Sequence, residues 1–232
     1  MVLTHLPVNL DDPRLVAFFD RLQRIFAAMD RQYAEVARHY GFHCNGCEDN
    51  CCRTRFYHHT YLEYLYIHAG LNKLDHQRRR EIQSRAAVIY RQSAQADEKA
   101  MPVRLMCPLN FDGRCTLYTY RPMICRLHGI SHELRKPGQN VIPGPGCGMF
   151  DLRCSDKSYL KFDRTPFYFE MAKLESELKQ AVDLSGRIKM TIAEMIAGIE
   201  HRAEGRGEKT EVRRQWTENM ELGSRNSEWG NS

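Results

Sequence analysis

The sequence lacks several features that would assign it to a secreted or membrane class. The amino terminus, MVLTHLPVNLDDPRLV, has no basic flank, no unbroken apolar core and no small-residue cleavage site of an export signal. No stretch reaches the run of roughly eighteen apolar residues that spans a bilayer, and no internal repeat is visible. We therefore expect a cytoplasmic protein with no membrane association, in a reducing compartment where disulfides are disfavoured.

A large charge of one sign is also missing. The 232 residues contain 34 lysines and arginines against 29 aspartates and glutamates, which gives a formal net charge of +5. The densest basic run, Arg78 to Arg80, is followed at once by Glu81, and this pattern is typical of a solvated helix face. Nucleic acid is therefore not an expected partner.

Cysteine, in contrast, is abundant, with nine residues in the chain. An odd number leaves at least one thiol without a disulfide partner. Four of the cysteines form a C-x2-C-x3-C-C cluster between residues 44 and 52. Clustered thiols in a reduced chain are typical of a bound metal, so metal binding is the first interpretation.

The candidate ligands fall into an early and a late group. In the early group the C-x2-C spacing of Cys44 and Cys47 can aim two sulfurs at one point. The side chains of the adjacent Cys51 and Cys52 diverge, so one of this pair serves a second centre or packs beside the first. The late group contains Cys107, Cys115 and Cys125. Its fourth ligand is either Cys147 or His128, which lies one helical turn after Cys125. Eight ligands suit two four-coordinate centres, and fewer suit one centre plus structural cysteines. The candidates are Cys44, Cys47, Cys51, Cys52, Cys107, Cys115, Cys125 and Cys147.

Some neighbouring residues favour a plainer interpretation. A lone cysteine is commonly a small apolar side chain, and we assign Cys154 to this class. His43 and the His58-His59 pair fit surface or packing histidines better than ligands.

The chain outside the cysteines predicts helices. A long helix should begin at Asp12-Pro13 and end at Gly41, with one apolar stripe that packs into the protein's own core or binds a protein partner. Thr60 and Glu63 form a capping-box pattern for a short helix closed by Gly70. A more polar helix is expected from about residue 75 to 97. Two packing helices are expected later, one opened by Thr165-Pro166 and a final one that carries Ile188, Ile192, Met195 and Ile199.

The central segment should be irregular. Asp112-Gly113 predicts a tight hairpin that brings Cys107 and Cys115 together. Pro122 should start a short helix that carries Cys125 and stops at Gly129, and residues 136 to 148 should form a loop. The expected fold is mainly α, a single helical domain around a cysteine-rich metal centre with a short hairpin. Its parts are an N-terminal helix (1–40), the cysteine-rich region (41–160), packing helices (161–203) and a disordered tail (204–232).

Residues 40 to 150 resemble a known family, the bacterial YkgJ-like CxxCxxCC proteins, which are described as a zinc- or iron-chelating domain. The resemblance is carried by CNGCEDNCCR from Cys44, CPL from Cys107, GRCTLY from Gly113 and RPMICR from Arg121. Cys147-Gly148 resembles a later family cysteine, and the Cys47–Cys51 loop is one residue longer than the family's name implies.

The resemblance implies bound zinc or iron, the latter possibly within an iron–sulfur cluster. Adjacent cysteines and Cys107-Pro108 favour the cluster over zinc knuckles. Part of the wider family is associated with methylation of flagellin lysines, which gives the alternative of a metal-dependent enzyme such as a protein lysine N-methylase. Candidate substrate or cofactor contacts would then be residues that flank the thiolates, although each can equally be structural: Arg53, Tyr118, Arg121 and Arg126. The chain shows no G-x-G-x-G loop for S-adenosylmethionine and no C-x3-C-x2-C motif of the radical type.

Overall fold

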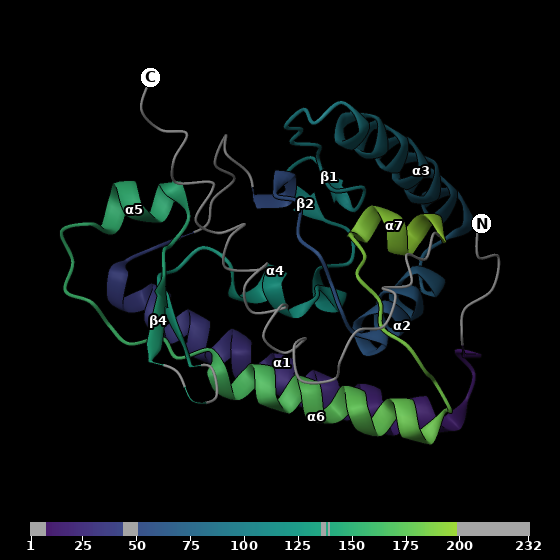
Figure 1. Ribbon diagram of the computed structural model, residues 1–232, viewed down its shortest axis with the longest axis horizontal. Helices are drawn as coiled ribbons and strands as arrows, with labels where there is room; N and C mark the ends of the chain where they lie inside the picture. Colours follow the sequence, from purple (N-terminus) through teal and green to yellow (C-terminus); the bar gives the residue numbers. More distant parts are fainter. Residues whose placement is uncertain (1–7, 44–50, 136–137, 139, 199–232) are drawn as a thin grey trace. The chain divides into compact units, whose positions relative to one another are not determined.

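The computed structural model describes residues 8–43, 51–135, 138 and 140–198 (Figure 1). Within these residues the chain is mainly α-helical, as the sequence predicts, with seven α-helices, two short 3₁₀ helices and two small antiparallel hairpins. No helix in this part is both long and apolar enough to cross a membrane. The expected tail from residue 204 and the first half of the early cysteine cluster lie outside the described residues.

The described residues group into two compact units. The first contains those of Met1–Phe19, Cys52–Pro122 and Glu175–Gly205, and the second contains those of Asp20–Cys51, Met123–Leu174 and Arg206–Ser232. The long helix α1 (Pro13–Tyr40) and the helix α6 (Thr165–Ala181) each contribute residues to both units. The expectation of a single domain stays a prediction.

The first unit is organised around α2 (Tyr61–Asn72), which is apolar on all sides and almost entirely buried. Thr60 caps it, because its hydroxyl oxygen accepts a hydrogen bond from the Glu63 backbone N–H at 3.2 Å. The two oxygens of the Glu175 carboxylate accept bonds from the N–H groups of Tyr61 and Leu62, each at 3.0 Å. Burial raises the pKa of this carboxyl to about 7.

Two further helices complete the first unit. Asp75 caps α3 (His76–Glu98) through the Arg78 N–H at 2.8 Å, close to the predicted start. The short helix α7 (Ile192–Ala197) packs against α3 (Figure 1). Met190, which lies just before α7, exchanges backbone hydrogen bonds of 2.8 and 3.0 Å with His58. His58 is buried, so this histidine has a packing role in the first unit.

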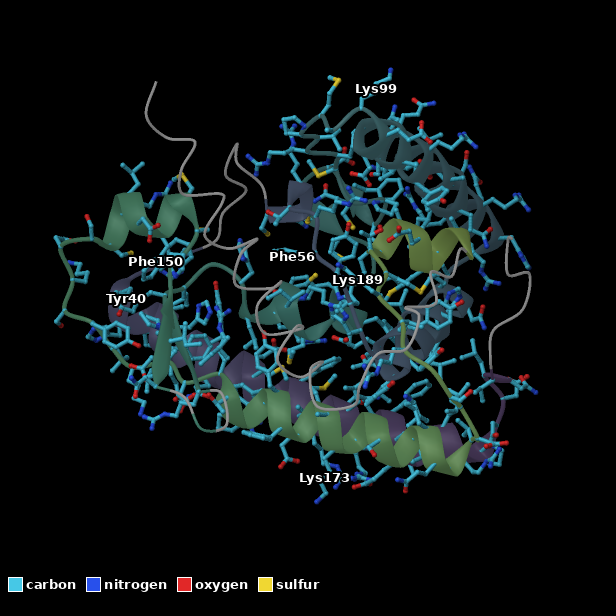
Figure 2. All side chains as sticks on the ribbon, viewed as in Figure 1. Tyr40, Phe56, Lys99, Phe150, Lys173 and Lys189 are labelled. Atoms are coloured by element: carbon cyan, nitrogen blue, oxygen red, sulfur yellow. The ribbon has the colours of Figure 1, made fainter. Side chains whose placement is uncertain are left out.

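The second unit contains α4 (Met123–Leu127), the hairpin of β3 (His132–Arg135) and β4 (Val141–Gly144), and α5 (Gly148–Cys154). Aromatic rings join α5 to the end of α1. The Phe150 ring lies edge-on to Tyr40 with centroids 4.8 Å apart, and Figure 2 shows these two labelled side chains together. Phe42 contacts the same ring at 5.3 Å.

The apolar stripe predicted for α1 is confirmed as a buried face. Leu15, Leu22, Met29 and Val36 recur every seven residues and are at most 3 % exposed. The helix ends at Tyr40, and Gly41 follows with a φ of +61°, the left-handed conformation that glycine adopts at helix ends. This face packs into the protein's own core, the first of the two alternatives for the stripe.

Three local predictions are wrong. Gly70 does not close α2, which continues to Asn72. The segment predicted as a loop over residues 136–148 contains β4, which tolerates Pro143 because β4 is an edge strand that pairs with β3 on one side. The last helix does not include Ile188, because the capping box of Thr191 and Glu194 sets its start at Ile192.

Candidate metal centre

The hairpin of β1 (Asn110–Phe111) and β2 (Arg114–Cys115) places two late cysteines beside one early cysteine. The Cys107 backbone N–H donates to the Cys52 carbonyl at 2.8 Å, and the Asn110 N–H donates to the Cys107 carbonyl at 3.0 Å. Asn110 in turn is the antiparallel partner of Cys115. Hydrogen bonds and strand pairing therefore connect Cys52, Cys107 and Cys115, which we call the hairpin thiols.

The turn of this hairpin is set by the sequence, as predicted. Asp112 and Gly113 have φ values of +50° and +80°, the left-handed pair that a type I′ turn requires. The Asn110 side-chain oxygen also accepts a bond from the Gly113 N–H at 3.2 Å. Cys107 and Cys115 are thus brought together from opposite sides of a tight turn.

The hairpin thiols lie in half-buried positions. Burial raises the pKa of the Cys107 thiol well above its ordinary value, and charge on Cys52 and Cys115 acts in the same direction. Arg85 of α3 acts in the opposite direction. The charges of the three thiols therefore affect one another. The positive charge of Arg85, on a helix that is distant in sequence, affects Cys107.

A second pair of cysteines lies in the second unit, where Cys125 is carried by α4 and Cys147 caps α5. The Cys147 N–H donates to the Gly129 carbonyl at 3.1 Å, in the turn that follows α4. His128 lies in the same turn, and its N–H donates to the Ile124 carbonyl at 3.0 Å. We call Cys125 and Cys147 the turn cysteines.

A buried arginine holds this turn in place. The Arg164 guanidinium donates to the carbonyls of Leu127 and Ile130, the latter at 3.1 Å, and burial lowers its pKa to about 10. Burial also lowers the pKa of His132 to about 2, and the charges of Arg164 and His128 add to this effect. His132 is therefore neutral at physiological pH.

Three of the four residues proposed as substrate contacts, Tyr118, Arg121 and Arg126, have structural partners. Arg126 is buried and pairs with Asp30 at 2.5 Å, and its guanidinium lies 4.2 Å over the Phe26 ring. Arg121 lies 3.6 Å over the exposed ring of Tyr118. Arg53 ends the 3₁₀ helix η1 (Cys51–Arg53).

The structure leaves the complete ligand set a prediction. Cys44 and Cys47 lie outside the described residues. Within the described ranges no group of three or more His, Cys, Asp or Glu side chains, the hairpin thiols included, is arranged to hold a metal ion. The hairpin thiols belong to the first unit, whereas Cys51 and the turn cysteines belong to the second. Cys154, which we assign to a packing role, is buried with its sulfur 3.8 Å from the Tyr40 carbonyl oxygen.

Sequence reasoning missed two arginines near the cysteines, Arg85 and Arg164. Neither lies beside a cysteine in the sequence, so no local signal marks them. Comparisons with protein-family models, with curated proteins and with solved structures give no match for this chain.

Proposed function

We propose that the protein binds a metal through clustered cysteine thiolates, as an iron–sulfur cluster or as zinc. The observation that carries this proposal is the hydrogen-bonded connection of Cys52, Cys107 and Cys115 around the hairpin turn. Local sequence preference alone does not join the backbones of two distant segments at these cysteines. A shared metal is the usual reason for such a group in a compartment where disulfides are disfavoured.

Electrostatic repulsion among the thiolates favours a bound metal. Thiolates repel one another, and burial disfavours each of them further, so a half-buried group of three is unfavourable without a compensating cation. A bound metal supplies that positive charge and releases the thiol protons as it binds. The donor set, which is all sulfur, suits both zinc and iron–sulfur clusters.

The remaining ligands would come from neighbouring sequence. A four-coordinate centre needs one more donor than the three hairpin thiols supply. Cys44 and Cys47 precede Cys52 on the same short segment, which makes them natural partners for this group. The turn cysteines and His128 would contribute to a second centre.

The test is the metal content of the full chain purified without oxygen. We expect at least one equivalent of zinc, or iron with acid-labile sulfide and visible absorption, in the wild type. Cys107→Ser should lose most of this metal, whereas the matched control Cys154→Ser should keep it because Cys154 packs against the Tyr40 carbonyl. A colourless, metal-free wild type, or equal metal in both variants, would contradict the proposal.

A further inference from the structure

Two arginines of α3 meet the ring of Phe111 in the β1–β2 hairpin, which lies beside this helix (Figure 1). The guanidinium carbons of Arg78 and Arg85 lie 4.2 and 4.1 Å from the centre of the ring, within the range of a cation–π contact. The two arginines are seven residues apart, which is close to two turns of helix, so they lie on the same face of α3. Two positive charges are therefore gathered at one ring.

A third arginine comes from the other strand of the hairpin. Arg114 of β2 is the register partner of Phe111. Directly opposed residues of an antiparallel pair project from the same face of the sheet, with their Cβ atoms about 5 Å apart. Arg114 is exposed, and so are Asp112 and Gly113 in the turn between the strands. Three arginines therefore meet beside a turn that faces solvent, and we call them the Phe111 arginines.

The positive charge at this place is only partly compensated. Arg78 forms an ion pair with Glu81 at 2.9 Å. Neither Arg85 nor Arg114 has an ion pair or a hydrogen bond with any residue that the structure describes. Because Arg78 and Arg85 contact the same ring, their charges lie within about 8 Å of each other and repel. A bound anion would offset this repulsion.

Stacking on a ring leaves the hydrogen-bonding edge of a guanidinium available. Its N–H donors lie in the plane of the group, whereas the contact with the ring uses the face of that plane. The ring also fixes the side chain, so less conformational entropy is lost when a ligand binds. Guanidinium groups held in this way suit phosphate oxygens, which they bind through paired, charge-assisted hydrogen bonds.

We propose that Arg78, Arg85 and Arg114 form a binding site for a phosphate group carried by a side chain of a protein partner. Such a phosphate has close to two negative charges near pH 7 and three acceptor oxygens, which suits three arginines gathered at one ring. An exposed turn is open to a phosphate that a large partner carries, whereas sites for small molecules are concave and enclose the ligand. This site goes beyond the proposed function and needs no bound metal.

The grouping of the arginines also separates this partner from nucleic acid. A single strand of nucleic acid is bound along a basic groove that follows its backbone, with aromatic rings on which the bases stack. The Phe111 arginines are gathered at one point, and two of them occupy the ring itself. One phosphate group fits this arrangement better than a strand does.

The experiment titrates N-acetyl-phosphoserine amide into the full, isotope-labelled chain at constant ionic strength, followed by NMR. We expect saturable shifts of the Gly113 amide signal and of the Nε signals of the Phe111 arginines. The unphosphorylated compound, N-acetyl-serine amide, should produce no saturable shift, because only the phosphate pairs with the guanidinium groups. The Kd of each variant is then compared with that of the wild type.

Arg114→Gln is the main variant, because Arg114 is exposed and has no described contact whose loss would loosen the hairpin. It should raise the Kd about threefold, and Arg85→Gln should raise it about tenfold. Asp112→Asn should lower the Kd by removing a negative charge from the turn, and asparagine tolerates the φ of +50° at this position. The matched control is Arg80→Gln, an exposed position about 200° around α3 from Arg78, which should leave the Kd unchanged.

Three results would overturn the proposal. The first is the absence of saturable binding of N-acetyl-phosphoserine amide to the wild type. The second is an equal loss of affinity in Arg80→Gln and Arg114→Gln, because it would show that general surface charge attracts the probe. The third is saturation of the same signals by single-stranded oligothymidylate at a lower concentration of phosphate groups, which would assign the surface to nucleic acid. If Arg85→Gln loosens the hairpin, Arg114→Gln still decides the question.

Discussion

Adding a single methyl group at Gly70 tests how tightly α2 packs against the Tyr120 ring. Gly70 lies inside α2, where replacing glycine by alanine ordinarily strengthens a helix by about 1 kcal/mol. Here an added Cβ would stand 2.6 Å from Cγ and 2.8 Å from Cδ2 of the Tyr120 ring. Cγ is the ring atom bonded to Cβ, so rotation of the ring does not remove the clash.

The magnitude follows from these two opposing effects. Overpacking costs about 1–3 kcal/mol, and a contact this short belongs at the upper end. After subtraction of the helix-propensity gain, Gly70→Ala should lower the free energy of unfolding by roughly 2 kcal/mol. Urea unfolding followed by far-ultraviolet circular dichroism measures this difference directly.

A double-mutant cycle shows whether the ring is the cause. Tyr120→Ala removes the clashing atoms, so Gly70→Ala should cost much less in that background than in the wild type. Gly148→Ala is the matched control, because no atom lies within 4 Å of the Cβ that it adds. The reasoning is refuted if Gly70→Ala is as stable as the wild type, or if the cycle is additive.

Three other predictions concern stability, each measured by urea unfolding. Gly113→Ala should lower the free energy of unfolding by about 1 kcal/mol, because Gly113 has a φ of +80° in the hairpin turn. A loss no greater than that of Gly148→Ala would contradict this prediction. Burial raises the pKa of Glu175 from its ordinary value of 4.5 to about 7, so between these pH values the folded state holds a proton that the unfolded state has lost. The contribution of Glu175 to the free energy of unfolding should therefore fall by roughly 3 kcal/mol as the pH rises from 4.5 through 7. Glu175→Gln should abolish this pH dependence. An unchanged pH dependence in the variant would show that another group titrates. Asp30→Asn removes the charge that pairs with buried Arg126 and should cost about 2 kcal/mol, less at high salt, whereas no loss would show that the Phe26 ring alone holds the guanidinium.

The helix starts could be predicted because their signals are local. Pro13 opens α1, Thr60 and Asp75 cap α2 and α3 through their own side-chain oxygens, and Asp112-Gly113 sets the hairpin turn. Each of these depends on residues within one turn of the chain. The starting residues found in the structure match the predicted ones closely for this reason.

The wrong predictions depend on contacts between distant residues. Gly70 reads as a helix stop, but it is a glycine because Tyr120 packs against that point of α2. Pro143 reads as a loop residue, but it lies in β4 opposite Glu133. The start of α7 is different, because it is set by a local signal, the capping box of Thr191 and Glu194. The helical spacing that begins at Ile188 predicts an earlier start.

The candidate site could be predicted only in part for the same reason. The clustering of cysteines and the turn between Cys107 and Cys115 are visible in the sequence. The bond that joins Cys107 to Cys52, and the approach of Arg85 through Phe111, depend on how α3 and the hairpin pack. No local spacing contains that information.

X-ray absorption at the metal edge, on the full chain purified without oxygen, tests the central claim most directly. Thiolate ligation predicts a first shell dominated by sulfur at about 2.3 Å for zinc, and for a cluster an iron neighbour beyond the sulfur shell. This sulfur signal should be lost in Cys107→Ser and retained in Cys154→Ser. A first shell made only of oxygen and nitrogen, or the absence of any bound metal, would contradict the account.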